Sequence, residues 1–402
     1  MTVAMCTIVA NNYISMARTL VHSYLERYPD GKAFVLVVDE NEPDAAAQEA
    51  FTVIKLQDMQ IPDEKSFCFK YDVLELCTAV KPYLLEYLFK RAGVEKILYF
   101  DPDILITGSL AAVYQWLDRY SIVLTPHIMS PIGLDGCKPS EIDILKAGVY
   151  NLGFIGVSGG ETTNRFLAWW KARLYHHCLA APEQGLFVDQ KWIDLVPYLF
   201  GNTYVITEPE YNVAYWNLHE RKLTRINGAY EINGRPLAFF HFSGFDVSLK
   251  QLSKFQNRHN WKNSPSLLPL YQHYRLLLLS NGYSGSKESK YAYDYFDNGA
   301  KIHKFIRTIY YRLGNGMRQF GNPFQISGQN SFYRWLASPV NGDSVIPKVL
   351  YELYKAREDL QRAFPDGLGA NQRRLMMWAK IALPRDYGIG NEFFRREADE
   401  SR

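Results

Sequence analysis

The beginning of the chain alternates between apolar runs and one amphipathic stretch. Residues 3–10 and 33–38 are apolar runs of strand length. Between them, Ala17, Leu20 and Tyr24 recur at the spacing of one helix face, which predicts a helix. Because a strand, a helix and a second strand in this order are typical of a parallel sheet with crossover helices, the pattern predicts an α/β fold.

The alternation of strand and helix patterns continues down the chain. It predicts strands at 97–100, 121–124, 149–157, 204–206 and 237–242, helices at 72–80, 82–91, 109–118, 161–179 and 186–199, and a polar loop at 131–147. A stretch rich in Gly and Ser at 282–289 predicts a linker, and the pattern beyond it is mainly helical. We therefore expect a mixed sheet with flanking helices in residues 1–281 and a helical region in residues 282–402.

The charge balance argues against a nucleic-acid-binding protein. The formal net charge is only +3, apolar residues make up 47% of the chain and charged residues 22%, as in ordinary globular proteins. The charge is uneven, since residues 301–402 carry 17 Lys and Arg against 10 Asp and Glu. This basic C-terminal region favours an anionic partner.

The cysteines and the N-terminal segment predict a cytoplasmic protein. There are five cysteines, an odd number, and none form a Cys-x-x-Cys pair, which indicates buried thiols in a reducing compartment. The apolar N-terminal segment lacks a basic leader and is predicted to be a strand rather than a signal peptide. No apolar run is long enough for a membrane span, which needs about 18 residues.

Two aspartates follow the apolar run at 97–100. Asp101 and Asp103 are separated by one proline, and a second apolar run begins at Ile104. The end of a buried strand is where open α/β sheets bind ligands, and alternate residues of an extended segment point the same way. Hard cations such as Mn²⁺ or Mg²⁺ bind carboxylate and phosphate oxygens together. The pair therefore predicts a metal that holds a diphosphate.

Four further polar motifs occur along the chain in a characteristic order. They are Asn11-Asn12-Tyr13, Asn151-Leu152-Gly153-Phe154, Asp189-Gln190 and His241-Phe242-Ser243-Gly244. Together with Asp101-Pro102-Asp103, they resemble the retaining glycosyltransferases of GT-A fold, and most closely the glycogenin and lipopolysaccharide galactosyltransferase family (family eight). The resemblance extends over residues 3–245.

The resemblance implies a role for each motif. Asp101, Asp103 and His241 would bind Mn²⁺ or Mg²⁺, and Asp189 and Gln190 would line the reacting face. The donor would be held by Ala10, Asn11, Asn12, Tyr13, Lys81, Asp101, Asn151, Ser243 and Gly244. One motif departs from the family, which usually follows the late His-x-x-Gly with Lys-Pro-Trp. Here Phe245-Asp246-Val247 follows, and the next lysine is Lys250, so the group that covers the pyrophosphate is open.

The function implied is transfer of a sugar from a nucleotide donor, most simply UDP-linked, to a glycan or lipid-linked acceptor in bacterial polysaccharide synthesis. Retention requires either a covalent carboxylate intermediate or same-face attack with the donor phosphate as base. We favour same-face attack, because an amide such as that of Gln190 is a poor nucleophile. A polar-aromatic cluster that would receive the acceptor or pack in the core is formed by Tyr211, Asn212, Tyr215, Trp216 and His219, of which Tyr215, Trp216 and His219 are the chosen acceptor candidates.

Two other classes of protein and two roles of the C-terminal region stay open. A nucleotidyltransferase would have a Gly-rich basic loop after the first strand, where this chain has Asn11-Asn12-Tyr13. A non-catalytic sugar-binding protein of the same fold would bind the donor without releasing UDP. The basic C-terminal region would either shape the acceptor site or dock on an anionic membrane, at its inner face.

Overall fold

The computed structural model describes residues 3–39, 49–328, 330–342 and 344–394. The chain divides into two compact units, Met1–Gln60 with Leu74–Tyr291, and Ile61–Val73 with Ala292–Arg402. The division thus falls between Tyr291 and Ala292 rather than between residues 281 and 282. The short segment 61–73 belongs to the second unit, although the sequence pattern gives no sign of that.

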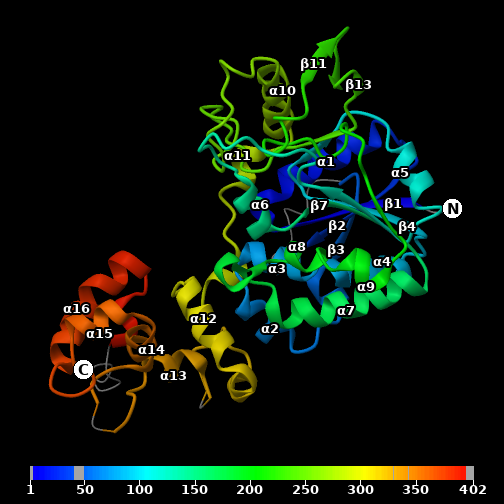
Figure 1. The fold of residues 1–402 in the computed structure, drawn as a ribbon. Coiled ribbons are helices and arrows are strands. Elements are labelled where there is room, and N and C mark those ends of the chain that lie inside the picture. Colours follow the sequence, from blue (N-terminus) through cyan, green and yellow to red (C-terminus); the bar gives the residue numbers. More distant parts are fainter. Residues whose placement is uncertain (1–2, 40–48, 329, 343, 395–402) are drawn as a thin grey trace. The chain divides into compact units, whose positions relative to one another are not determined.

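A seven-stranded mixed sheet forms the centre of the first unit (Figure 1). The strand order is β10-β6-β7-β4-β1-β2-β3, and every neighbouring pair is parallel except those that involve β7. The strands are β1 (Val3–Val9), β2 (Lys32–Val37), β3 (Thr52–Lys55), β4 (Lys96–Phe100), β6 (Ile122–Pro126), β7 (Tyr150–Ser158) and β10 (Thr203–Val205). The expected mixed α/β sheet is confirmed.

Helices cover both faces of this sheet, and Figure 1 shows α4, α7 and α9 on one side and α1 on the other. Ile97, Leu98 and Phe100 of β4 are fully buried between these layers, and burial of each such side chain contributes roughly 1.5–3 kcal/mol. The helices of the unit are α1 (Ile14–Leu25), α3 (Val73–Ala79), α4 (Lys81–Arg91), α5 (Ala111–Trp116), α6 (Glu141–Ala147), α7 (Glu161–His177), α8 (Gln190–Ile193), α9 (Val196–Phe200), α10 (Leu267–Ser280) and α11 (Tyr283–Ser286), with 3₁₀ turns η1 (Asn11–Tyr13), η2 (Leu56–Met59) and η3 (Pro182–Gln184).

Three predicted segments differ from the structure. Residues 141–147 form α6 inside the expected loop, because Ser140 and Asp143 make a capping box that starts the helix. The expected helix at 186–199 is broken into β9 (Leu186–Phe187), α8 and α9, and Val188 has a positive φ of 43°. The expected linker at 282–289 contains α11, whose Ser286 Oγ donates to Ser15 Oγ of α1 at 3.1 Å.

Smaller sheets flank the main one. β5 (Ile104–Ile106) pairs antiparallel with β14 (Phe239–His241), so the second apolar run after Asp101 leaves the main sheet. β8 (Ala180–Ala181) pairs with β9, and β11 (Leu223–Ile226), β12 (Ala229–Ile232) and β13 (Arg235–Pro236) form a meander. The pairing of β5 with β14 joins two segments that are far apart in the sequence.

The second unit is helical and has its own aromatic core. Phe69 from α2 (Glu64–Lys70) packs against Tyr310 and Phe332 at centroid distances of 4.7 and 5.4 Å. This packing explains why segment 61–73 belongs to the second unit. The other elements are η4 (Ala292–Asp294), α12 (Lys304–Arg312), η5 (Gly314–Phe320), α13 (Phe332–Ala337), α14 (Lys348–Ala356), α15 (Glu358–Ala363), α16 (Gln372–Ala382), a π-helical turn η6 (Leu383–Tyr387) and η7 (Asn391–Phe394). The expected helical C-terminal region is confirmed.

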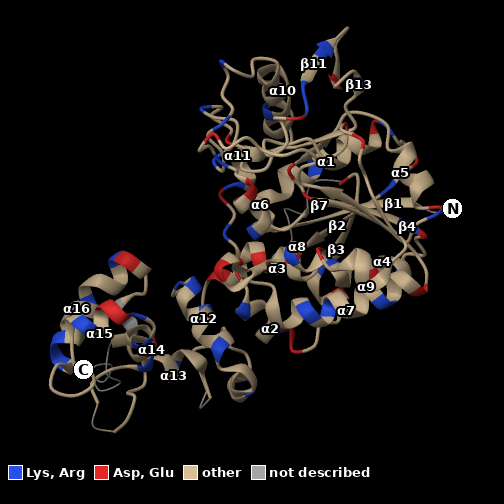
Figure 2. Cartoon of the chain, in the orientation of Figure 1, with Lys and Arg blue, Asp and Glu red and all other residues tan. Residues whose placement is uncertain are grey.

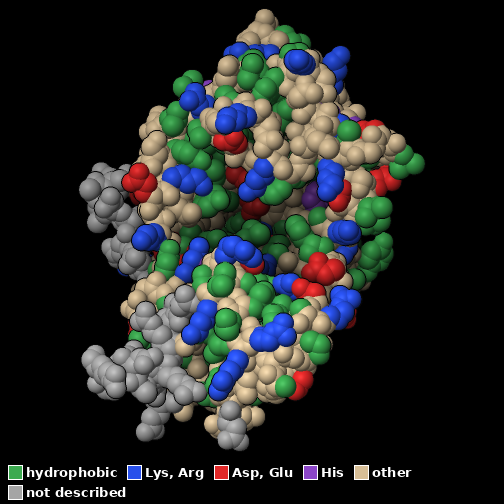
Figure 3. Space-filling view, turned by 90° about the vertical axis from the view of Figure 1, so that its left-hand side faces the viewer, with side chains coloured by type: hydrophobic (Ala, Val, Ile, Leu, Met, Phe, Trp, Pro, Cys, Tyr) green, Lys and Arg blue, Asp and Glu red, His purple; other side chains and the backbone are tan. Residues whose placement is uncertain are grey.

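Basic residues are spread over the second unit rather than gathered in one block. Figure 2 shows Lys and Arg along α12, and both basic and acidic residues on α15. On the face drawn in Figure 3, Lys and Arg side chains are scattered among apolar and uncharged surface. Within the described residues, no helix is both long enough and apolar enough to cross a membrane.

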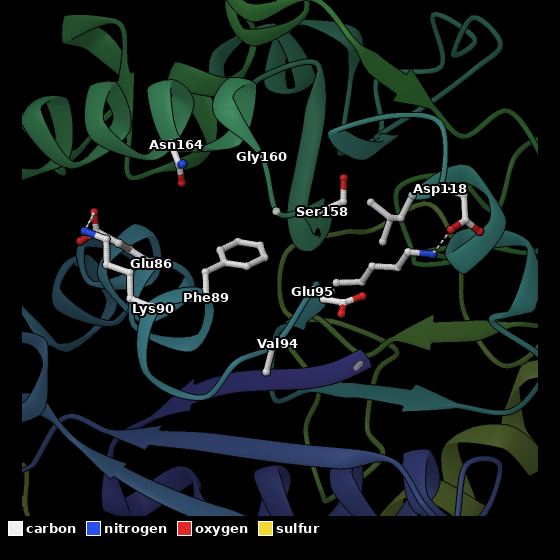
Figure 4. Close-up of a pocket in the computed structure, with 12 residues that line it drawn as sticks. Glu86, Phe89, Lys90, Val94, Glu95, Asp118, Ser158, Gly160 and Asn164 are labelled. Carbon is white, nitrogen blue, oxygen red and sulfur yellow. Dashed lines mark hydrogen bonds and ion pairs between the residues drawn. The ribbon is translucent and has the colours of Figure 1, made fainter. Parts of the chain in front are cut away.

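A hollow of about 860 Å³ lies at the amino end of β4. Figure 4 shows the ring of Phe89 between Glu86 and Lys90 on one side and Asp118 on the other. Four of the charged groups around it form two ion pairs, Lys96 Nζ with Asp118 Oδ1 and Lys90 Nζ with Glu86 Oε1. It lies at the opposite edge of the sheet from Asp101.

Candidate functional site

Asp101, Asp103 and His241 meet at the carboxyl end of β4. Asp101 and Asp103 lie in the turn between β4 and β5, and Ile104 of β5 pairs with His241 of β14. The Phe242 N–H donates to Asp103 O at 2.8 Å and extends this pairing. As a result, one ligand atom from each of the three side chains lies within 4.8 Å of the others. The structure thus brings the three predicted metal ligands together.

The three side chains fit a hard divalent cation. His241 Nε2 lies 3.0 Å from Asp103 Oδ1. Adjacent ligands of an octahedral Mg²⁺ ion, each about 2.1 Å from the metal, lie about 3 Å apart. Two carboxylates and an imidazole are also an acceptable ligand set for Mn²⁺. Burial lowers the pKa of His241, but the Asp103 carboxylate raises it more, so its pKa lies above the usual value.

Lys81 is enclosed by protein atoms beneath Asp101. It is only 1% exposed, and its Nζ lies 2.6 Å from Asp189 Oδ2 and 3.9 Å from Asp101 Oδ1. Nζ also donates to Leu152 O at 2.9 Å and lies 4.2 Å from the centroid of the Tyr99 ring. The Tyr99 hydroxyl donates to Asp101 Oδ1 at 2.8 Å. Lys81 Nζ therefore lies within ion-pair distance of both carboxylates. Because the Tyr99 hydroxyl donates to Asp101 Oδ1, Asp101 Oδ2 is the oxygen that remains available to a metal.

Asp189 is the N-cap of α8 and is almost fully buried. Burial raises its pKa to about 6, while the charge of Lys81 acts in the opposite direction. Its neighbour Gln190 uses its whole amide within the protein. Gln190 Oε1 accepts from the N–H of Leu152 at 2.9 Å, and Nε2 donates to Ala147 O at 3.0 Å. Gln190 thereby fastens the end of α6 to the start of β7.

Asn151 lies at the same sheet edge as Asp101 because β7 runs antiparallel to β4. Its Nδ2 donates to Gln190 Oε1 at 3.2 Å, and its Oδ1 accepts from Asn212 Nδ2 at 3.0 Å and from Gly153 N at 3.1 Å. His127 Nε2 lies 3.2 Å from the same Nδ2. These buried groups form one polar network behind the metal ligands. The sequence motifs predicted Asn151 and Gln190 as site residues but not His127, and the sequence pointed to Asn212 only as a member of the polar-aromatic acceptor cluster.

Residues 10–13 directly follow β1, and because β1 is parallel to β4 they lie at the same edge of the sheet as Asp101. The N–H of Asn11 donates to the buried Asp39 Oδ2 at 2.6 Å, which fixes the backbone of η1 after Ala10. Within the described residues, Asn12 Oδ1 is buried without a hydrogen-bond partner. Burial raises the pKa of Tyr13, and the charge of nearby Asp103 adds to this effect.

Lys287, beside Tyr13, and Lys254, whose charge acts on Lys287, were not predicted as site residues. Lys287, which follows α11, places its Nζ 4.6 Å from the centroid of the Tyr13 ring. Burial and the nearby charge of Lys254 lower the pKa of Lys287. In the described part of the chain neither lysine forms an ion pair. The family motifs include neither lysine, because both lie after residues 3–245, over which the resemblance extends.

Glycines allow the close packing around His241. A Cβ on Gly153 would lie 2.3 Å from His241 Cε1, so β7 must carry glycine there for the imidazole to fit. Gly244 has a φ of 71°, and its Cβ would lie 2.5 Å from Ser253 Oγ. The O of Gly244 accepts from Lys254 N at 3.2 Å. Ser243 is half-buried in this same turn after β14.

The predicted acceptor residues divide into a buried and a more accessible set. Trp216 is 4% exposed and packs edge-on against the rings of His241 and His127, at 5.1 and 5.4 Å between centroids. Tyr215 and His219 are half-buried, and His219 Nε2 lies 3.1 Å from Ser130 O. Trp216 thus supports His241, and the other two side chains retain access to solvent.

No protein-family model matches this chain. Two uncharacterised proteins of Bacillus subtilis (strain 168) are similar to it. YfnF is 28% identical over 265 residues, which cover 61% of this chain and 83% of that protein. YfnD is 26% identical over 247 residues, which cover 60% and 77%.

Solved glycosyltransferases resemble the chain weakly. The galactosyltransferase LgtC, in complex with donor and acceptor sugar analogues, covers 69% of this chain at 17% identity and a TM-score of 0.40. GlyE of Streptococcus pneumoniae TIGR4 covers 73% at 14% identity and 0.40, and a glycosyltransferase that takes part in glycosylating the PBCV-1 major capsid covers 60% at 11% and 0.36. Since these scores are below 0.5, the function has to be argued from the residues of the site.

Proposed function

We propose that this chain is a metal-dependent glycosyltransferase that takes a sugar from a nucleotide donor, most simply a UDP-sugar. The observation that carries the proposal is the meeting of Asp101, Asp103 and His241, from two distant segments, at the carboxyl edge of an α/β sheet. Ligands bind at this edge in open α/β sheets. A bound Mn²⁺ or Mg²⁺ would neutralise the charge that develops on a diphosphate leaving group.

The donor nucleotide would lie along the end of β1. Asn12 Oδ1 is a buried acceptor without a protein partner and is suited to a base N–H. Tyr13 is partly exposed beside Asp103 and offers a ring face to the base or ribose. Ala10, Asn11, Ser243 and Gly244 would form the rest of this wall through their backbone.

The diphosphate would be covered by Lys287 and Lys254. These lysines are held near each other although both carry positive charge, and neither has an ion-pair partner within the described residues. An anion between them would relieve this repulsion. They would therefore take the role that the absent Lys-Pro-Trp motif has in the family the sequence resembles.

The sugar would face Asn151, Asp189 and Gln190. The carboxylate of Asp189 is buried against Lys81, which makes it a poor candidate for a covalent nucleophile. This supports same-face attack: an acceptor oxygen bonds to the anomeric carbon as the bond to the phosphate oxygen breaks, and the acceptor proton passes to a phosphate oxygen. The polar network around Asn151 would hold the residues on the far side of the sugar in place.

The acceptor would be a glycan or a lipid-linked sugar that contacts Tyr215 and His219. The similarity to two Bacillus subtilis proteins supports a bacterial setting, and we place the reaction in the cytoplasm or at the inner face of the membrane, in polysaccharide synthesis. The 1–281 region, extended by α11 and Lys287 of the same compact unit, would act as the catalytic part. The basic region 282–402 would shape the acceptor site or dock on anionic lipid.

The test begins with a thermal-shift screen of nucleotide sugars with and without Mn²⁺. The correct donor should raise the melting temperature more in the presence of metal, because ligands of the native state stabilise it. With that donor, release of UDP should fall about 1000-fold in the double variant Asp101→Ala/Asp103→Ala, if the metal supplies about 4 kcal/mol. Asp118→Ala, at the opposite sheet edge, should retain activity.

Two results would contradict the proposal. Undiminished UDP release by the double variant in the presence of a chelator would exclude this metal site. Metal-linked donor binding without UDP release, across a panel of acceptors and water, would instead indicate a non-catalytic sugar-binding protein.

A further inference from the structure

Phe255 is an exposed aromatic side chain beside the candidate site. It is 52% exposed, and a Cβ on Gly244 would lie only 2.7 Å from its Cδ2 atom. We propose that Phe255 and Tyr215 form the stacking surface for a pyranose ring of the acceptor. This surface rests on the proposed function, since it presupposes a donor sugar at the metal site, and it deepens that function by naming the chemical group that the acceptor brings.

A run of aromatic contacts leads from the candidate metal ligands to Phe255. The ring of Trp216 lies 5.1 Å from that of His241, and the ring of Tyr215 lies 5.0 Å from that of Trp216, measured between centroids. The rings of Tyr215 and Phe255 are 6.5 Å apart and inclined by 39°. The two proposed stacking residues are therefore joined to the candidate metal centre by packed rings.

The loop that carries Phe255 is fixed through its own backbone. Leu252 and Ser253 are fully buried. The N–H of Phe255 donates to Ser253 Oγ at 3.2 Å, and the N–H of Lys254 donates to Gly244 O at 3.2 Å. Binding to a surface that is already ordered avoids the entropy cost of fixing a loop. Phe255 is thus exposed on a support that is held in place before a ligand arrives.

A second set of bonds joins this loop to the loop before α6. Arg258 donates from Nε to Asp135 Oδ2 at 2.9 Å and from Nη2 to Asp135 Oδ1 at 3.0 Å, a bidentate arrangement that fixes geometry as well as contributing energy. The N–H of Lys138 donates to Asn257 Oδ1 at 2.7 Å. The two loops therefore support each other, which further limits the movement of Phe255.

The chemistry of this surface suits a sugar better than a plain hydrocarbon chain. The C–H groups of a pyranose form an apolar face that packs on an aromatic ring, while its hydroxyls need hydrogen bonds. Burial raises the pKa of Tyr215, and the charges of Asp103 and Asp143 add to this effect, so its hydroxyl keeps its proton and can donate. The Lys254 Nζ, 4.9 Å from the centroid of the Phe255 ring, offers further donors.

The test measures sugar binding by the full-length protein without donor or metal. The methyl pyranosides of β-D-glucose, β-D-galactose and α-D-mannose would be titrated while saturation-transfer difference NMR follows their ring C–H protons. We expect saturation of at least one sugar, and a Kd for it about 10 times higher in Phe255→Ala, as for the loss of one aromatic contact. Phe255→Tyr keeps the ring and should bind as the wild type does.

The matched control is Tyr198→Ala. Tyr198 is also an exposed aromatic residue, 90% exposed on α9, and its removal should leave the Kd for the sugar unchanged. Equal Kd values in Phe255→Ala and in the wild type would overturn the inference. So would the absence of saturation for all three sugars.

A kinetic measurement separates this surface from the proposed function. With a donor and an acceptor sugar that together release UDP, Phe255→Ala should raise the KM for the acceptor about 10-fold and leave the KM for the donor as in the wild type. An unchanged acceptor KM would overturn the stacking role while the glycosyltransferase function stands. Sugar binding that depends on Phe255 without any UDP release would contradict the function and support the stacking surface.

Discussion

Lys81 Nζ lies 2.6 Å from Asp189 Oδ2, and the two side chains are only 1% and 2% exposed. The pair joins the start of α4 to the start of α8 and lies directly beneath Asp101. Removing two charges from water is costly, and the attraction between them repays this cost only when both partners are held in a favourable geometry. Here it places one positive charge between two carboxylates.

The first prediction concerns the pH dependence of stability. Burial raises the pKa of Asp189 from 3.8 to about 6 in the folded protein. The folded state therefore binds this proton more tightly than the unfolded state, and the contribution is present below pH 4 and lost as the pH rises through 6. Urea unfolding of wild type and Asp189→Asn should show the variant gaining about 3 kcal/mol relative to wild type between pH 4 and 7. A constant difference across this range would contradict the raised pKa.

The second prediction concerns the other partner of this pair. Lys81→Met leaves the Asp189 carboxylate buried without its counter-ion, which should cost about 3–5 kcal/mol of unfolding free energy near pH 7. The loss should be smaller near pH 5, where Asp189 takes up a proton. Lys171→Met is a suitable control, because Lys171 is more exposed and pairs with Glu86. Equal losses in the two variants would argue against a special role of the buried pair.

The third prediction concerns Gly153. In Gly153→Ala the new Cβ would lie 2.3 Å from His241 Cε1, so the imidazole must move away from Asp103. We expect Mn²⁺ binding, measured by isothermal titration calorimetry, to weaken by at least about 10-fold. Gly159→Ala at the end of β7 meets its nearest atoms at 3.6 Å and should bind Mn²⁺ as the wild type does. Normal binding by Gly153→Ala would show that His241 is not a ligand in this position.

The fourth prediction separates donor binding from metal binding. Lys287→Ala should raise the Kd for UDP about 10-fold, as for the loss of one charge-assisted hydrogen bond, and leave the Kd for Mn²⁺ alone unchanged. Lys262→Ala removes an exposed lysine from another loop and should change neither constant. If UDP binding is equally tight in Lys287→Ala, another group covers the diphosphate.

The fifth prediction concerns an exposed face of α16. Met377 and Ile381 are each 70% exposed and lie among the exposed Arg373, Arg374 and Lys380, a combination suited to an anionic lipid surface. The chain should sediment with phosphatidylglycerol vesicles and not with phosphatidylcholine vesicles. Arg373→Glu/Arg374→Glu should lose this binding, at roughly 1 kcal/mol for each basic residue. Lys301→Glu/Arg318→Glu carries the same charge change elsewhere in the unit and should retain it.

The sequence predicts the elements whose signals are local. The apolar runs of β1, β2, β4 and β7 and the helical spacing of α1 and α7 are found close to the expected positions. The capping box at Ser140 could have identified α6, since Ser followed three residues later by an acidic residue marks a helix start. The polar composition of the region 131–147 predicts a loop instead, and the structure shows the helix that the capping box indicates.

Other parts of the site depend on contacts between distant segments. Asn212 and His127 join the network through hydrogen bonds to Asn151, and Lys287 reaches Tyr13 from α11. No spacing within a short window encodes these contacts. The same holds for segment 61–73, whose Phe69 packs in an aromatic core built from residues after 292.

β7 runs antiparallel to β4, so the amino end of β7, where Asn151 lies, is at the same edge of the sheet as Asp101. The candidate metal ligands come from residues 101–103 and from His241 at the end of β14, whereas Asn151 follows the stretch 127–149 that leads into β7. This stretch can change length or composition without altering the register of β5 and β14. In the proposed glycosyltransferase it would therefore be the segment to exchange in order to alter the choice of donor sugar without altering the metal ligands.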